Sequence, residues 1–154
     1  MRKYVPRLLL WLFGLDLGIA FGAGIYESRV VVPQWEDTPP QTWPNTGLEF
    51  WVYVTTVPLT LLTLANLVAA WQDQGPRRHW WLGAVAITVA ERSATFSYFI
   101  PTMIRLMGTE DLPEAEVHAT LSQWLLLDYG RHALTLAAWL AALKALSSPG
   151  ERGG

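Results

Sequence analysis

The chain has 154 residues, enough for one domain, and a formal net charge of −2. This near-neutral balance excludes the basic footprint of a nucleic-acid-binding protein, so we expect no nucleic-acid partner. The absence of cysteine excludes disulfides, thiolate metal sites and thiol chemistry. Hydrophobic residues make up 51% of the sequence, and they are concentrated in four long stretches. We therefore expect one integral membrane domain, residues 1–154, surrounded by the lipid bilayer.

The first apolar stretch, residues 8–26, follows a basic N-terminus. As a helix it spans about 28 Å, close to the roughly 30 Å hydrocarbon core of a bilayer. Asp16 lies within it and no small-residue cleavage site follows, so we interpret it as a retained helix and not as a signal peptide. On another face Gly14, Gly18 and Gly22 recur at four-residue spacing. That stripe fits either close packing within the chain or the seam of a homo-oligomer.

Residues 30–49 connect the first stretch to the second and contain four prolines. Because proline lacks an N–H and fixes its backbone angle, we expect an extended connection with little helix. Its Trp35 and Trp43 are placed to fold back as a lid. The second stretch, residues 50–71, contains no charged residue, but Asn66 and several threonines share one helical face.

The third and fourth stretches, residues 80–107 and 119–146, carry charges near their centres. Together with the first stretch they place six ionisable groups at mid-membrane depth: Asp16, Glu91, Arg92, Asp128, Arg131 and His132. Each such group costs roughly 2.5–3.5 kcal/mol on insertion scales, so these groups are expected to face each other or a polar cavity. We therefore expect an all-α, antiparallel, up-down-up-down bundle of four transmembrane helices with a polar, charged interior.

Basic residues are concentrated on one side of this expected bundle. The N-terminus, the short connection with Arg77 and Arg78, and the C-terminal region are basic, whereas the other two connections are acidic. The positive-inside rule then places both termini in the cytoplasm and the chain in the inner (plasma) membrane as a multi-pass protein. The Ser/Pro/Gly-rich tail, residues 147–154, is expected to be disordered.

The six central charges admit two interpretations. The arginines stay protonated, two carboxylates neutralise them, and the third carboxylate is free to be protonated, to pair with His132 or to act as a base. The group is therefore either a network of ion pairs that only fixes the helices, or a reactive or binding site.

Three segments carry a resemblance to a known family. The first helix ends GAGIYESRVVVPQW, the third ends FSYFIPTMIRL, and the fourth contains WLLLDYGRHALTLAAWLAALKAL. In these segments and in its expected topology the chain resembles the anthrone oxygenase-like family of small four-helix membrane proteins. The resemblance implies that a phenolic tricyclic ketone, or a similar hydrophobic aromatic or quinol-like molecule, is oxidised by O₂ without metal or flavin, and hence without a cofactor.

Such a reaction needs a base that forms an enolate, a fixed positive charge that stabilises this anion, and a dry apolar pocket. Imidazole changes protonation near neutral pH, which makes His132 the candidate base. Arg92 and Arg131 are candidates to stabilise the anion, and Glu91 and Asp128 complete the expected catalytic group.

The residues expected to bind the hydrophobic small molecule are Asp16, Glu27, Tyr98, Phe99, Trp124 and Arg105. The aromatic members can stack on a flat ligand, and Arg105 can add positive charge. We further expect Glu27 to pair with Arg29 or Arg105, and so to anchor the proline-rich connection over the mouth of the bundle.

Other chemistry has less support. A non-haem iron site needs two histidines and a carboxylate, but His118 precedes His132 by about 21 Å along one helix and His79 lies at the opposite membrane face, so no metal is expected. A haem on His132 alone lacks a paired ligand. The competing function is a non-catalytic binding or helper protein, or a small proton-linked transporter. A cavity with aromatic walls and an unpaired His132 or carboxylate favours the enzyme, whereas complete ion pairing without a cavity favours the helper.

Overall fold

A computed structural model describes residues 5–35 and 38–148, and within these ranges the chain is helical with no strand. We call each run of the chain along the long axis a pass. The first pass comprises α1 (Val5–Tyr26), the π-helical segment η1 (Glu27–Val31) and the 3₁₀ segment η2 (Val32–Trp35). A short 3₁₀ segment, η3 (Pro40–Thr42), precedes the second pass. The second pass comprises α2 (Leu48–Phe50), the π-helical η4 (Trp51–Thr56) and α3 (Val57–Gln72). The third comprises α4 (Arg78–Ala94), the π-helical η5 (Thr95–Phe99) and α5 (Ile100–Gly108), and the fourth is α6 (Glu114–Ser147).

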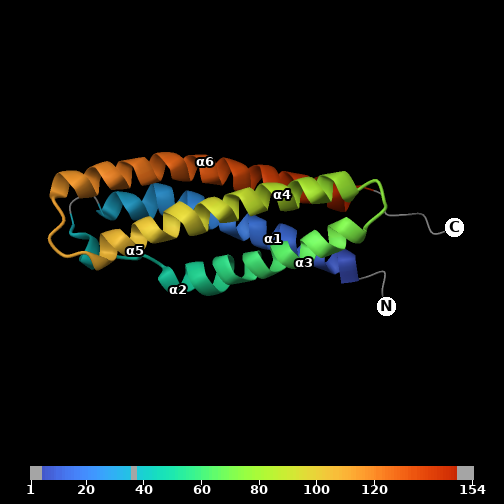
Figure 1. The fold of residues 1–154 in the computed structure, drawn as a ribbon, viewed down its shortest axis with the longest axis horizontal. Coiled ribbons are helices and arrows are strands. Elements are labelled where there is room, and N and C mark those ends of the chain that lie inside the picture. The colour runs from blue at the N-terminus through green and yellow to red at the C-terminus, as the bar shows by residue number, and fades with distance from the viewer. Residues whose placement is uncertain (1–4, 36–37, 149–154) are drawn as a thin grey trace.

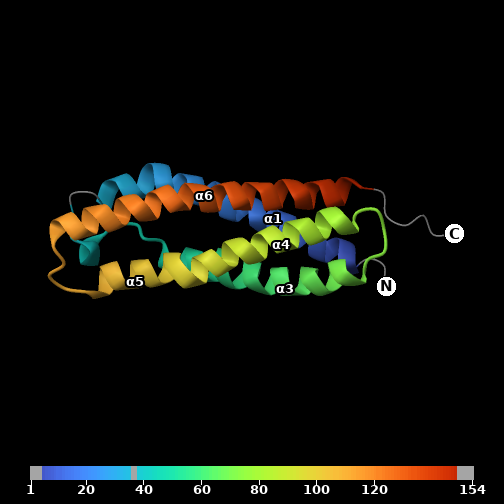
Figure 2. The ribbon, with the colours of Figure 1, turned by 45° about the horizontal axis from the view of Figure 1, so that its top comes forward.

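The four passes lie alongside one another, and consecutive passes run in opposite directions along the long axis (Figures 1 and 2). The start of α1, the α3–α4 turn and the end of α6 lie at one end, which we call the terminal end (right in Figure 1). The segment between η2 and α2 and the α5–α6 turn lie at the other, the loop end. Arg77 and Arg78 therefore lie at the terminal end, and the acidic α5–α6 turn lies at the loop end.

The helices are longer than the hydrophobic pattern predicted. The expectation of an extended connection with little helix is wrong for residues 30–35 and 40–42, which are helical. Pro40 is tolerated because it occupies the first turn of η3, where the missing N–H has no partner to lose. Pro33 follows the π-helical η1 directly, and the helix continues past it as the tighter 3₁₀ segment η2. The fourth helix begins at Glu114, before the expected residue 119, because acidic residues are favourable in a first turn. At its other end Ser147 is still helical, and the expected disorder of residues 149–154 lies outside the described residues.

Two of the passes are long and apolar enough to cross a membrane. These are Val5–Trp35, 31 residues with a mean hydropathy of 1.9, and Leu48–Gln72, 25 residues with a mean hydropathy of 1.7. Large apolar side chains are exposed around the bundle, including Leu8 (58%), Leu61 (61%) and Leu126 (71%). A contiguous apolar exterior of this kind is unusual for a soluble monomer and marks a surface that contacts lipid or another protein.

The interior holds two apolar clusters. In the terminal half, Leu10, Phe13 and Leu17 of α1 pack with Leu59, Trp81 and a row of alanines on α6. The Trp81 indole donates a 2.9 Å hydrogen bond to the Asn66 side chain, so the only polar tip of this large ring is satisfied. In the loop half, Val32, Trp35, Phe99 and Trp124 belong to a second cluster. The buried charged side chains, which include Glu91, Arg92 and Asp128, lie between these two apolar clusters.

The glycine stripe of α1 faces the last helix of the same chain. A Cβ on Gly18 would lie 3.0 Å from the Trp139 ring, and a Cβ on Gly14 would lie 3.7 Å from Leu146, whereas a Cβ on Gly22 would meet nothing within 4 Å. Gly14 and Gly18 therefore serve the packing of α1 on α6. A homo-oligomer seam along this stripe stays a prediction.

Candidate functional site

Three of the four passes contain a π-helical segment, and all three segments contribute to one pocket. Each ends two residues before a proline, at Pro33, Pro58 and Pro101. A proline removes one hydrogen bond of the helix and its ring clashes with the carbonyl four residues earlier, so the preceding turn widens. Isolated π-helical turns occur frequently at functional sites. Here they place side chains of η1, η4 and η5 around the same space.

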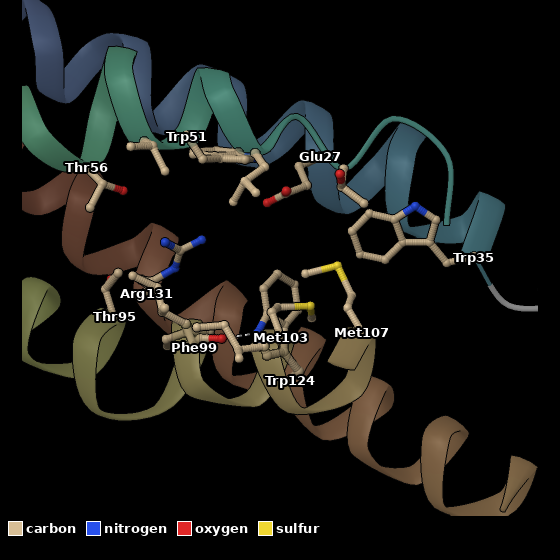
Figure 3. A pocket seen from close by; sticks show the side chains of 15 residues that line it. Glu27, Trp35, Trp51, Thr56, Thr95, Phe99, Met103, Met107, Trp124 and Arg131 are labelled. Atoms are coloured by element: carbon tan, nitrogen blue, oxygen red, sulfur yellow. Dashed lines mark hydrogen bonds between the residues drawn. The ribbon is translucent and has the colours of Figure 1, made fainter. Parts of the chain in front are cut away.

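The pocket lies in the loop half of the bundle and has a volume of about 320 Å³ (Figure 3). Its aromatic walls are Trp35, Trp51, Phe99 and Trp124, and Met103 and Met107 add polarisable surface. Phe99 and Trp124 meet edge to face with ring centroids 5.6 Å apart. The volume is at the small end of the roughly 300–1,000 Å³ range of ligand pockets, which suits a molecule of two or three fused rings.

Two charged side chains enter this apolar space. Figure 3 shows Glu27 and Arg131 directed into the cavity from opposite walls. Glu27 is 9% exposed, and among the described residues no ion pair within 4 Å involves it. Its environment is set by the positive charge of Arg131, the negative charge of Asp128 and the Trp51 indole. Glu27 is therefore a buried carboxylate without a cation in contact, which is the kind of group that performs proton transfer.

The expected pairing of Glu27 with Arg29 or Arg105 is wrong. Arg29 lies 5.4 Å from the centre of the Tyr129 ring, and Arg105 forms an exposed ion pair with Glu116. The physical reason is that the helix continues through this region. At about 100° per residue, the Arg29 side chain points to the side of the helix opposite Glu27. In an extended chain both side chains could have pointed toward the mouth of the bundle.

Arg131 connects the pocket to a chain of buried charges. It lies 2.6 Å from Asp128 Oδ1 and 3.8 Å from Glu91 Oε1, and its guanidinium is 4.8 Å from the centre of the Phe99 ring. Asp128 is fully buried, and its other oxygen lies 2.9 Å from His132 Nε2. The guanidinium is thus held from behind by two carboxylates and from one side by an aromatic face, which fixes its position at the pocket wall.

Glu91 and Arg92 form the far part of this chain. Their side chains share two hydrogen bonds of 2.5 and 2.7 Å, and the Thr95 hydroxyl donates to Glu91 Oε1 at 3.0 Å. Asp16 is buried, its Oδ2 has no hydrogen-bond partner, and Arg92 is the cation that acts on it. Five of the six predicted central charges are therefore linked by contacts, and Asp16 lies beside them without an ion pair.

Ser28 and Gly24 belong to this site, and the sequence interpretation missed both. Ser28 Oγ lies 2.9 Å from the Gly24 carbonyl, 3.0 Å from Asp128 Oδ2 and 2.9 Å from His132 Nε2. A Cβ on Gly24 would lie 2.8 Å from His132 Nδ1 and closer still to Cε1, so only glycine admits the ring. The available signal was the four-residue spacing of Gly24 and Ser28, which places both on the α1 face that meets α6.

Ser28, His132 and Asp128 do not form a hydrolytic triad. Both contacts of the imidazole use Nε2, whereas a triad needs the carboxylate on one ring nitrogen and the serine on the other. His132 is 4% exposed and is not among the residues that line the pocket. The cluster therefore supports Asp128, and through it Arg131.

The predicted site residues divide into two groups. Those that line the pocket are Glu27, Phe99, Trp124 and Arg131. Those that do not are Asp16, Glu91, Arg92, Tyr98, Arg105, Asp128 and His132. Trp35, which was expected to fold back as part of a lid, also lines the pocket, and so does Trp51, which was not among the predicted site residues. In the described part of the chain no three His, Cys, Asp or Glu residues are placed to hold a metal ion.

Comparisons with family models, with curated proteins and with solved structures give no match to this chain. The resemblance to the anthrone oxygenase-like family therefore stays a prediction, and the function is argued from the geometry of the pocket.

Proposed function

We propose that this chain is a membrane-embedded enzyme that oxidises a planar, hydrophobic, weakly acidic molecule with O₂, using Glu27 as the base and Arg131 to stabilise the anion. The observation that carries this proposal is the opposition of a buried carboxylate without a contacting cation and a fixed guanidinium across an aromatic-walled cavity. An oxygenase that needs no cofactor requires a base and a fixed positive charge, and Glu27 and Arg131 can supply them in this pocket.

The chemistry follows from the two charges. Glu27 removes a proton from an acidic C–H of the substrate, and Arg131 stabilises the enolate that remains. The electron-rich anion reduces O₂ by one electron, and the resulting carbon radical and superoxide combine to a peroxide. With anthrone as the substrate, loss of water from the peroxide leaves anthraquinone. The methylene carbon loses two hydrogens and gains one oxygen, and the second oxygen atom leaves as water.

We propose that all four passes cross the inner (plasma) membrane, with the terminal end in the cytoplasm. The two apolar passes and the exposed leucines support this position. The central charges of the other two passes, Glu91, Arg92, Asp128, Arg131 and His132, are buried in the interior or nearly so, as intramembrane charges usually are. Arg77 and Arg78 at the terminal end agree with the positive-inside rule. The hydrophobic small molecule would then bind in the outer half of the bundle.

The experiment is the oxidation of anthrone by the purified chain in lipid nanodiscs, followed as O₂ uptake and anthraquinone formation. Glu27→Gln keeps the shape of the side chain and removes the base, so the rate should fall by about 10²–10⁴-fold. Glu110→Gln, in the exposed α5–α6 turn, is the matched control and should leave the rate unchanged. A rate no higher than that of protein-free nanodiscs, or an unchanged rate in Glu27→Gln, would refute the proposal.

A second candidate is a non-catalytic binding or helper protein, which the contacts among Glu91, Arg92, Arg131 and Asp128 favour because such a network also fixes the helices. Saturable binding of anthrone without O₂ uptake would support it. A proton-linked transporter has less support, because the apolar cluster around Leu17 and Trp81 fills the terminal half of the bundle, where a transporter needs a polar route.

A further inference from the structure

The pocket is closed toward the loop end by a pair of tryptophans. The Trp35 and Trp43 rings stack with centroids 4.7 Å apart and planes within 8°, and their side chains are 3% and 6% exposed overall. Each indole N–H is bonded to a backbone carbonyl, Trp35 to Pro44 and Trp43 to Thr38. The Gln41 amide donates to the Thr109 carbonyl, which ties this segment to the α5–α6 turn. Trp35 and Trp43 therefore form a fixed cap in which both indole N–H groups have a partner.

The pocket is also closed toward the terminal end. Thr56, Thr95 and Arg131 are its deepest lining residues along the three passes that carry them. Beyond Thr95 lies the buried ion pair of Glu91 with Arg92, followed by the apolar cluster of the terminal half. A ligand therefore has no route along the bundle axis in either direction within the described residues.

The side of the bundle between the second pass and α5 is different. Side chains on these two walls line the cavity and also reach the outer surface of the bundle. At the rim, Leu48 and Ile104 are 62% and 63% exposed although both line the cavity. Figure 3 shows Trp51 and Met103 facing each other across the space from these two walls. The cavity thus opens sideways, over roughly 10 Å between the levels of Leu48 and Thr56.

The surface around this side opening is apolar. Phe50, Val54 and Val57 of the second pass are 39%, 41% and 47% exposed beside it. If the passes span a bilayer, as the proposed function holds, the opening faces acyl chains in the outer half of the membrane. A charged or strongly polar molecule is excluded from that phase, whereas a neutral molecule of two or three fused rings is concentrated in it.

We propose that the site takes its ligand from the hydrocarbon phase of the bilayer through a side portal between Leu48 and Ile104. The substrate class is a planar aromatic ketone or phenol that is neutral in lipid and becomes an anion only beside Arg131. The inference rests on the proposed function for the membrane position of the passes, but it concerns entry and does not require turnover.

The test uses benzophenone dissolved in the nanodisc lipids. Under ultraviolet light this ketone takes a hydrogen from a nearby C–H bond, which methionine offers readily, and the two carbons then join. Met103 and Met107 line the pocket, so mass spectrometry should find the adduct on these two residues. The double variant Leu48→Trp/Ile104→Trp narrows the rim and should remove most of that labelling.

The matched control is Leu61→Trp/Leu140→Trp, which adds the same bulk at positions that are 61% and 55% exposed and do not line the pocket. Its labelling should equal that of the unaltered chain. Circular dichroism confirms that each variant remains helical.

Two results would overturn the portal: no adduct on Met103 or Met107, or equal labelling in the rim variant and the unaltered chain. Benzophenone has no acidic C–H or O–H, so its entry is independent of catalysis. Labelling without anthrone oxidation would leave the portal standing and remove the enzyme. Anthrone oxidation together with equal labelling in the rim variant would support the enzyme and exclude the side portal.

Discussion

At the scale of the residue, the absence of a side chain at Gly24 determines where the His132 ring lies. The His132 ring fills the space that a Cβ at position 24 would occupy. From there it contacts Asp128 and Ser28. Asp128 in turn holds Arg131 at the pocket wall. A glycine that touches no ligand thus determines the position of the cation that we propose stabilises the anion.

Gly24→Ala should lower the free energy of unfolding by about 1–3 kcal/mol, because the new methyl group overlaps the His132 ring and forces it to move. Thermal unfolding in detergent measures the change. Gly22→Ala is the matched control two residues away. Its Cβ meets nothing within 4 Å, and alanine is favoured over glycine in a helix by up to about 1 kcal/mol, so stability should be equal or higher. Equal loss in the two variants would show that helix geometry, and not the ring, is responsible.

Arg131→Leu should lower the free energy of unfolding by about 3–5 kcal/mol, because it leaves the buried carboxylates of Asp128 and Glu91 without their shared cation. Arg105→Leu is the control, since its ion pair with Glu116 is exposed and such pairs contribute about 0–1 kcal/mol. Chemical denaturation of both variants measures the difference. Comparable stability of the two would mean that the buried network is not held by Arg131.

The central charges were predictable from the sequence, because ionisable groups inside apolar stretches have to meet in the interior. Glu27, Phe99, Trp124 and Arg131 were also named as candidates, and they line the pocket. Ser28 and Gly24 were not, because their partners lie about a hundred residues away, and their four-residue spacing shows a shared face but not which residues of α6 that face meets. Arg131 and His132 point about 100° apart on α6, but the sequence does not show which of these two directions meets the pocket.

At the scale of the element, the π-helical segments distinguish this bundle from a regular one. A regular helix repeats its faces every 3.6 residues, whereas each widened turn of η1, η4 and η5 shifts that repeat. The sequence predicted the passes because apolar runs dominate them. It could not predict the directions in which Trp51 and Thr95 point, because the periodicity of a π-helical turn differs from that of a regular helix. The proline two residues after each segment is the signal from which the widened turns can be recognised.

Deletion of Ser97 should convert η5 to regular helix, because a π-helical turn is equivalent to one inserted residue. The packing faces of α4 and α5 then keep their register, so helical content and thermal stability should be retained. The pocket wall formed by Thr95 and Phe99 is displaced, so benzophenone labelling of Met103 and anthrone oxidation should both be lost.

Deletion of Ala90 in α4 is the comparison for that experiment. It leaves η5 in place and rotates the two parts of the third pass against each other by about 100°, so it should destabilise the whole bundle. Unchanged pocket labelling after deletion of Ser97 would contradict a role for the widened turn.

At the scale of the whole molecule, the two halves of the bundle have different tasks. The terminal half is filled by interlocking apolar side chains, and the loop half encloses a cavity beneath a tryptophan cap. The boundary between them is the row of charges. This division is consistent with a membrane protein that is rigid on one side of the bilayer and receives a ligand on the other.

Reporter fusions test the membrane orientation. Fusions after Ser148 and at Gly75 should both report the cytoplasm, because these positions lie at the basic terminal end, and a fusion at Asn45 should report the opposite side. Reporters on the same side at Gly75 and Asn45 would contradict four membrane crossings, since an odd number of passes separates the two positions.

The contact between Gly24 and His132 also has an evolutionary consequence. Neither position is free to vary alone, because a larger residue at 24 needs a smaller one at 132, and a ring at 132 needs glycine at 24. Among descendants of the same ancestral chain these two positions should therefore change together or not at all. A lineage that exchanges both at once should also alter position 128, because the carboxylate there would lose its imidazole neighbour while keeping the arginine.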